Sequence, residues 1–203
     1  TNTSDGLLTI ELLERFNQYS KNLIALLGPD SALNKNLTQR KEGAALSIYQ
    51  LVKQHFSTVA IECVSHLERV NNLRSTSSAA RSLAFAVKNQ IPAVITNQIR
   101  MLDKSDGPLL DVLDANRKLS FINSASVERS NAEAYLKDSQ SMHQIADLIA
   151  RAAGESSSRA LLKTTADISL ECELSARGEI GIGGIHLPEP ALFGASNQAQ
   201  LVN

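Results

Sequence analysis

The chain has 203 residues, of which 43% are hydrophobic and 4% aromatic, and its formal net charge is −1. A chain of this size and composition can bury a core, so the composition predicts a globular protein. Acidic and basic residues are interspersed, and this balance argues against the basic surface that a nucleic-acid-binding protein needs. We therefore expect no nucleic-acid partner.

The two cysteines and the absence of a membrane span favour a cytoplasmic protein. Cys63 and Cys172 are far apart and lie within apolar patterns, which is typical of buried thiols rather than of a disulfide scaffold. The sequence has no run of about 18 apolar residues, and its first six residues lack the features of a signal peptide. A processed secreted form, whose leader would precede Thr1, remains an alternative.

The first half of the chain predicts three helices. Residues 10–27 place apolar side chains on one helix side after Thr9, and Gly28-Pro29 ends the pattern. A second helix is expected from Thr38 to Val70, because its apolar residues are three or four positions apart, as in a bundle or coiled-coil seam. Those residues are Ala45, Ile48, Val52, Phe56, Val59, Cys63, Leu67 and Val70.

The third predicted helix follows the serine-rich segment 75–78, and its apolar pattern continues from Leu83 to Leu102. Pro92 lies inside this pattern and lacks a backbone N–H. The proline therefore predicts either a kink or a division into two shorter helices.

The segment between Pro108 and Gly154 contains no glycine or proline and predicts one long helix, continuous or bent. Pro108 suits the first helical position, where its missing N–H has no intrahelical partner. Ser130 and Glu133 form a capping-box pattern, so a division into two helices, the second from Asn131, stays open.

After Gly154 the pattern of apolar residues alternates, which predicts a β-hairpin over residues 160–187 followed by an irregular tail over residues 188–203. Residues 176–178 suit a three-residue hairpin loop, and Gly183-Gly184 suits a bulge. The predicted strands share one apolar face. We expect this face to mediate assembly through Ile168, Leu170, Leu174, Ile180, Ile182, Ile185 and Leu187.

No motif in the sequence assigns catalytic, cofactor-binding or metal-binding residues. The predicted second helix carries His55, Glu62, Cys63, His66 and Glu68, but their spacing matches neither the di-iron nor the zincin pattern. His143 and His186 stand alone and are expected at the surface or at a sheet edge. The glycines at positions 181, 183 and 184 precede prolines rather than a helix, so they do not predict a phosphate loop.

These patterns predict a mainly α protein, with an antiparallel bundle of long helices over residues 9–153 and the hairpin as an appendage. We expect a non-enzymatic structural or interaction protein that forms homo-oligomers through helical seams and the hairpin; protein partners are compatible with this function. The alternative is a membrane-active helical protein in which Leu83–Leu102 or the hairpin enters lipid. An enzyme with an unrecognised site is the third interpretation.

Overall fold

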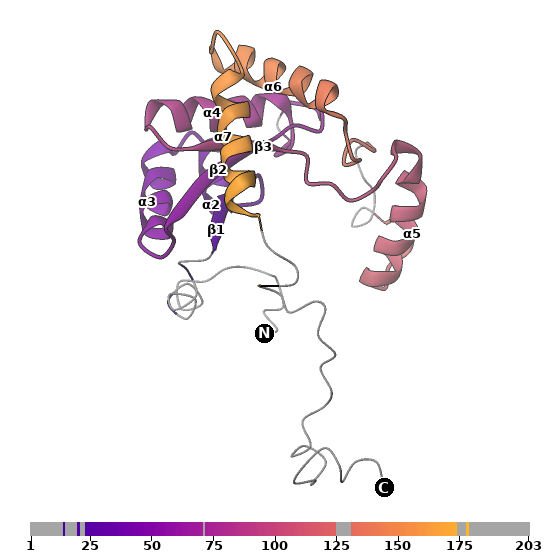
Figure 1. The fold of residues 1–203 in the computed structure, drawn as a ribbon. Coiled ribbons are helices and arrows are strands. Elements are labelled where there is room, and N and C mark those ends of the chain that lie inside the picture. Colours follow the sequence, from indigo (N-terminus) through magenta and orange to yellow (C-terminus); the bar gives the residue numbers. More distant parts are fainter. Residues whose placement is uncertain are drawn as a thin grey trace, which may run out of the picture. The chain divides into compact units, whose positions relative to one another are not determined.

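The computed structural model describes residues 23–70, 72–124 and 131–173, together with Glu14, Ser20 and Gly178. The chain divides into two units, Thr1–Asp167 and Ile168–Asn203. The described part of the first unit is an α/β arrangement in which helices pack on a small sheet (Figure 1).

The sheet has three parallel strands in the order β1-β2-β3. They are β1 (Ile24–Leu27), β2 (Thr58–Val64) and β3 (Ala93–Thr96). Ile61 in the central strand lies between Leu27 of β1 and Ala93 of β3. Central strands of parallel sheets are buried on both faces, and five of the seven residues in β2 are apolar and buried. The exceptions are Thr58 and Glu62.

The crossover helices follow from the parallel order, because each strand must return to the same end of the sheet. Helices α2 (Ala32–Thr38) and α3 (Glu42–Lys53) connect β1 to β2, and α4 (Thr76–Lys88) connects β2 to β3. Ser75 caps α4 by accepting a hydrogen bond from the backbone N–H of Ser78. The core lies between these helices and the sheet face formed by Val59, Ile61, Cys63, Ala93 and Ile95.

The later helices are α5 (Gly107–Lys118), α6 (Ser139–Ala153) and α7 (Arg159–Glu171), and a short 3-10 turn, η2 (Lys104–Asp106), precedes α5. Helix α6 packs on α4 and adds Ile145 and Ile149 to the core. Within the first unit, Leu161 of α7 joins the same core. Thr165 of α7 accepts a hydrogen bond from the backbone N–H of Ile95 on β3, at 2.9 Å.

The predicted antiparallel bundle of long helices, with its coiled-coil seam, is wrong. The helices that the structure describes are between 7 and 15 residues long and accompany a parallel sheet. Residues 24–27 form β1, the predicted second helix divides into α3 and β2, and the third divides into α4 and β3. A strand buried on both faces has no strict alternation, so its apolar residues also fit helical spacing.

The long helix predicted between Pro108 and Gly154 is also wrong, because α5 and α6 are separate helices. Pro108 lies in the first turn of α5, as predicted. The second helix does not begin at Asn131. It begins at Ser139, where Asp138 accepts a hydrogen bond from the backbone N–H of Ser141.

The predicted hairpin is contradicted where the structure describes it, because residues 159–171 form α7 instead of a strand. Two members of the predicted assembly face, Ile168 and Leu170, lie on this helix. The other five lie outside the described residues: Leu174, Ile180, Ile182, Ile185 and Leu187. Self-assembly through a hairpin therefore has no support in this fold.

Candidate functional site

Polar residues gather where the three parallel strands end. Gly28 follows β1, Ser65 and His66 follow β2, and Asn97 and Gln98 follow β3. Because the strands are parallel, their carboxyl ends meet at one edge of the sheet, which we call the carboxyl edge. Ligands of open parallel α/β sheets bind outside this edge, so the carboxyl edge is the candidate binding site.

His66 is buried at this edge and its tautomer is fixed by a backbone carbonyl. Its Nε2 lies 2.9 Å from the backbone oxygen of Asn97. A carbonyl only accepts, so Nε2 carries the proton and Nδ1 is left as an acceptor. Desolvation by burial lowers the pKa of His66, and the charges of Arg74 and Lys137 act in the same direction. The imidazole is therefore neutral near neutral pH.

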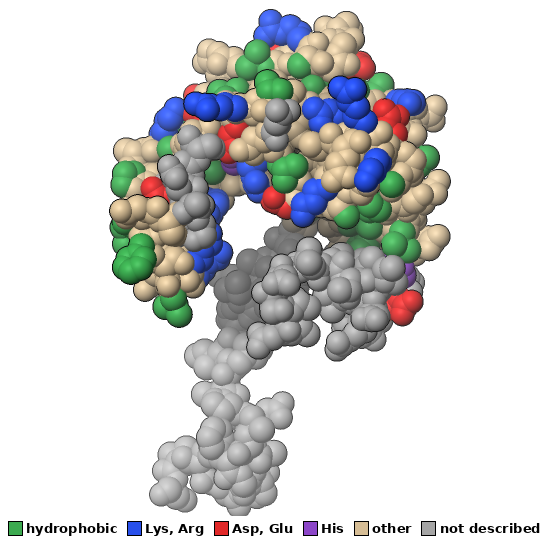
Figure 2. Space-filling model, turned by 180° about the vertical axis from the view of Figure 1, so that it is seen from behind, with side chains coloured by type: hydrophobic (Ala, Val, Ile, Leu, Met, Phe, Trp, Pro, Cys, Tyr) green, Lys and Arg blue, Asp and Glu red, His purple; other side chains and the backbone are tan. Residues whose placement is uncertain are grey.

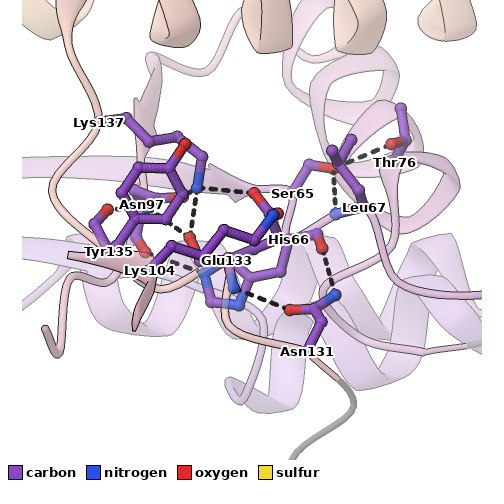
Figure 3. A network of polar contacts seen from close by, with 10 residues as sticks. All are labelled: Ser65, His66, Leu67, Thr76, Asn97, Lys104, Asn131, Glu133, Tyr135 and Lys137. Atoms are coloured by element: carbon purple, nitrogen blue, oxygen red, sulfur yellow. Dashed lines mark hydrogen bonds and ion pairs between the residues drawn. The ribbon is translucent and has the colours of Figure 1, made fainter. Parts of the chain in front are cut away.

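Asn97 holds the extended segment 131–137 against the carboxyl edge. Its Nδ2 donates to the backbone oxygens of Glu133 and Tyr135, at 2.9 and 2.7 Å, and its Oδ1 accepts from Lys137 Nζ at 3.2 Å. Asn131 Nδ2 donates to the backbone oxygen of His66 at 2.7 Å. Figure 3 shows these side chains converging from the loops after β2 and β3 and from the segment 131–137.

Two lysines share one carboxylate in this network. The side chain of Lys137 is 2% exposed, and its Nζ lies 3.2 Å from Glu133 Oε2 and also donates to the backbone oxygen of Glu133. Lys104 Nζ lies 2.5 Å from Glu133 Oε1, and its side chain is 61% exposed. Two ammonium groups and one carboxylate leave this group with one positive charge in excess.

Burial and hydrogen bonding shift the pKa values of Lys137 and Glu133. Desolvation lowers the pKa of Lys137, although its hydrogen bond and ion pair with Glu133 oppose this shift. Desolvation also opposes ionisation of Glu133, but the hydrogen bonds from Lys104 and Lys137 outweigh it and lower the pKa of this carboxyl. The aromatic ring of Tyr135, whose centroid lies 4.2 Å from Lys137 Nζ, adds a cation–π contact.

A second carboxylate lies beside the start of the loop after β1. Glu62 Oε1 accepts from Thr96 Oγ1 at 2.6 Å, and Oε2 accepts from Gln98 Nε2 at 3.1 Å. Arg74 donates through Nε to Gln98 Oε1 at 2.9 Å and forms an ion pair with Asp30. These bonds link the loops that follow β1, β2 and β3.

The backbone is strained at two positions of the carboxyl edge. Leu67 has a φ of 55° and Gln98 a φ of 41°, and they directly follow His66 and Asn97. The other described non-glycine residues with positive φ, Arg40, Gln90 and Leu119, follow helices, where this conformation is common. Leu67 and Gln98 instead lie in loops that follow strands, and backbone strain in such loops is typical of functional sites.

The residues considered as metal ligands do not form a cluster. Among the residues that the structure describes, no group of three or more His, Cys, Asp or Glu side chains is placed to hold a metal ion. His55 follows α3, whereas Glu62 and Cys63 are adjacent on β2 and therefore point to opposite faces of the sheet. The shared helix on which the sequence argument placed them does not exist.

The cysteines and lone histidines are only partly where the sequence predicted. Cys63 is buried, and desolvation raises its pKa to about 12, so the thiol is unreactive. Cys172, predicted to be buried, is exposed at the end of α7. His143 is exposed on α6, as predicted for a surface residue, and His186 lies outside the described residues.

Sequence reasoning missed the carboxyl edge because it placed His66 and Asn97 within or near long helices. The usable signal was a short apolar run followed at once by polar residues. Ser65-His66 follows the apolar run of β2, and Asn97-Gln98 follows that of β3. Repeated in two neighbouring elements, this pattern is typical of parallel strands that end at one site.

Two open cavities lie elsewhere on the first unit. One, of about 340 Å³, is lined by residues of α2, α3 and α4 and the turn after α2, including Arg40, Arg81 and the Lys88–Glu42 ion pair. The other, of about 350 Å³, is lined by α6 and the loop before α7. Neither includes a residue of the carboxyl edge.

Comparison of the sequence with protein-family models and with curated proteins finds no matching family and no significantly similar protein. The chemistry of the carboxyl edge is therefore the basis for inferring a function.

The neutral state of His66 predicts a loss of stability in mild acid. Because its folded-state pKa is lowered, the unfolded chain binds a proton that the folded chain does not bind, once the pH falls below about 6.5. The free energy of unfolding, measured by urea denaturation, should therefore fall as the pH is lowered through this range. The contribution of His66 should level off below its folded-state pKa.

A matched pair of variants assigns this effect to its residue. His66→Gln should flatten the pH dependence between about pH 6.5 and the acid limit, whereas His143→Gln, which changes an exposed histidine, should leave it as in the unaltered protein. Equal slopes in the unaltered protein and His66→Gln would show that His66 does not cause the loss.

Proposed function

We propose that the protein binds a small anionic ligand, carrying a carboxylate or phosphate group, at the carboxyl edge of its sheet. The observation that carries this proposal is the excess positive charge of Lys104, Lys137 and Glu133, with the Lys104 ammonium exposed to solvent. An ammonium group has three donors, and Glu133 takes one donor of Lys104. The others are directed to solvent or to a ligand.

The residues of the edge have different roles in this proposal. Lys104 contacts the anion directly because its side chain is accessible. Lys137 is too deeply buried to reach a ligand, and it contributes its charge through a region of low dielectric. His66 and Asn97 act as positioning residues, because their hydrogen bonds hold the loop after β2 and the segment 131–137 in place.

Binding is better supported than catalysis. A general acid or base must reach the proton that it transfers, yet Lys137 and His66, whose pKa values are lowered, are both buried. Lys104, the accessible member of the group, is held charged by Glu133 and suits an electrostatic contact. The proposed function is non-enzymatic, as is the function expected from the sequence. It is the binding of a ligand at the sheet edge, however, and not assembly through a hairpin.

Thermal unfolding in the presence of a panel of small anions tests the proposal. The panel consists of inorganic phosphate, nucleoside monophosphates and dicarboxylates, each compared with an uncharged analogue at equal ionic strength. A ligand at a hundred times its Kd should stabilise the folded chain by about 2.7 kcal/mol and raise the melting temperature. Increasing salt should weaken the effect, because the contact is electrostatic and exposed.

Lys104→Gln should abolish the ligand-dependent rise in melting temperature. Lys163→Gln, which removes an exposed lysine of α7 that also pairs with a carboxylate, should keep it. The proposal would be overturned if no anion stabilised the protein, or if Lys104→Gln and the unaltered protein responded equally.

A further inference from the structure

Helix α5 and the turn after it expose an unusual amount of apolar surface. Six large hydrophobic side chains within residues 109–122 are each at least 50% exposed. We call them the α5 surface: Leu109, Val112, Leu113, Leu119, Phe121 and Ile122. In Figure 2, hydrophobic side chains stand out on the part of the molecule formed by α5, at the left of the view.

The helix separates this apolar surface from its acidic residues. Leu110 and Ala115 are buried, and Asp114 is buried beside them in a bidentate pair with Arg100, at 2.8 and 2.9 Å. With 3.6 residues per turn, Asp111 and Asp114 lie roughly 140–160° around the helix from Leu109. The outward side of α5 therefore carries no carboxylate.

A cation borders the α5 surface. At 100° per residue, Arg117 in the last turn lies about 40° around the helix from Leu113 and is exposed, whereas Lys118 lies on the side of Asp111. The sequence contains no acidic residue from Ala115 to Ser124. Apolar side chains bordered by cations suit an apolar partner whose surface is negatively charged.

Leu119 and Phe121 are the most exposed members of the α5 surface. Leu119 ends α5 in the left-handed conformation that is common after helices, with φ of 49°. Its side chain is 92% exposed and Phe121 is 88% exposed, so neither contributes appreciably to the core. Large apolar side chains that are exposed together point to a contact outside the folded chain.

We infer that the α5 surface binds an anionic lipid membrane at the interface between headgroups and acyl chains. Leu119 and Phe121 protrude from the turn rather than lining a concave site, which suits insertion into a fluid surface. Arg117 borders this surface and meets the anionic headgroups. Contact is interfacial, because none of the helices in the described residues is long and apolar enough to cross a membrane.

Co-sedimentation of the full chain with vesicles tests this inference. Vesicles of equimolar phosphatidylcholine and phosphatidylserine should bind the protein, and vesicles of phosphatidylcholine alone should bind it much more weakly. A cation near an anionic surface changes the affinity about fivefold, so Arg117→Gln should weaken binding by about fivefold. This part of the binding should also decrease as salt is added.

The apolar contribution is measured with Leu119→Ser and Phe121→Ser together, which should weaken binding to the mixed vesicles by at least about tenfold. Val70→Ser provides the control, since Val70 is 71% exposed but lies in the loop after β2. Circular dichroism of each variant establishes that it is folded. These substitutions leave Lys104 unchanged, so the anion-dependent rise in melting temperature should persist in all of them.

Two results would overturn the inference. One is a full chain that does not sediment with the mixed vesicles. The other is equal binding of the unaltered protein and the Leu119, Phe121 double variant, which would place the lipid contact elsewhere. If the α5 surface instead contacts a protein, vesicles fail to bind while the same double variant loses that protein complex, and the lipid assignment is wrong.

Discussion

Lys137→Met is expected to lower the free energy of unfolding by about 3 kcal/mol, because it removes one partner of a buried ion pair. Lys137 Nζ bonds to Asn97 Oδ1, to the backbone oxygen of Glu133 and to the carboxylate of Glu133. The substitution leaves the first two acceptors without this donor and the carboxylate with Lys104 alone. Urea denaturation near neutral pH measures the difference.

Lys163→Met provides the matched control. Its ammonium also pairs with a carboxylate, Asp167, at 2.6 Å, but the side chain is 74% exposed. Exposed pairs of this kind contribute about 0.5 kcal/mol or less to helix stability. Adding Glu133→Gln to Lys137→Met should recover part of the loss by removing the buried charge. Similar losses in the two single lysine variants would contradict a buried role for Lys137.

Gly28→Ala is expected to destabilise the protein by about 2 kcal/mol, through lost hydrogen bonds of a partly buried carboxylate. A Cβ atom at residue 28 would lie 2.0 Å from Glu62 Oε2, so the carboxylate must move. Moving it breaks the bonds from Thr96 and Gln98, which tie β2 to the end of β3 and to the loop after β3. Urea denaturation again gives the free energy of unfolding.

Gly43→Ala is the control for the substitution itself. No atom lies within 4 Å of the Cβ position at Gly43, which is in α3, so alanine there should stabilise the helix by about 0.5–1 kcal/mol. Glu62→Ala should lose stability alone, but adding Gly28→Ala to it should cost little more. An additive double variant would mean that the conflict between the two side chains is not the cause.

Local signals in the sequence identified several features correctly. The missing N–H of proline placed the start of α5 at Pro108, and Gly28-Pro29 correctly marked the end of an element. The type of that element was wrong, because β1 is an apolar run of four residues that fits a helix or a buried strand equally well. Only pairing with β2, more than thirty residues away in sequence, decides between them.

Local sequence patterns could not predict the candidate site for the same reason. His66, Asn97 and Lys137 are separated by 31 and 40 residues in sequence, and they meet because parallel strands end at a common edge. The Ser130 and Glu133 pattern was read as a helix cap, yet Glu133 belongs to an extended segment whose backbone bonds to Asn97. A short stretch of sequence does not show that an amide side chain far away in the chain binds these backbone oxygens and competes with a helix for them.

The hydrogen bond between Ile95 of β3 and Thr165 of α7 also constrains when the first unit can be completed during synthesis. The backbone N–H of Ile95 donates to the hydroxyl of Thr165, which is synthesised 70 residues later. Until α7 has left the ribosome, the outer edge of β3 lacks this acceptor and can pair with other nascent strands. The nascent chain is therefore most vulnerable to aggregation after β3 is made and before α7 folds, which is the interval when a chaperone would have most effect.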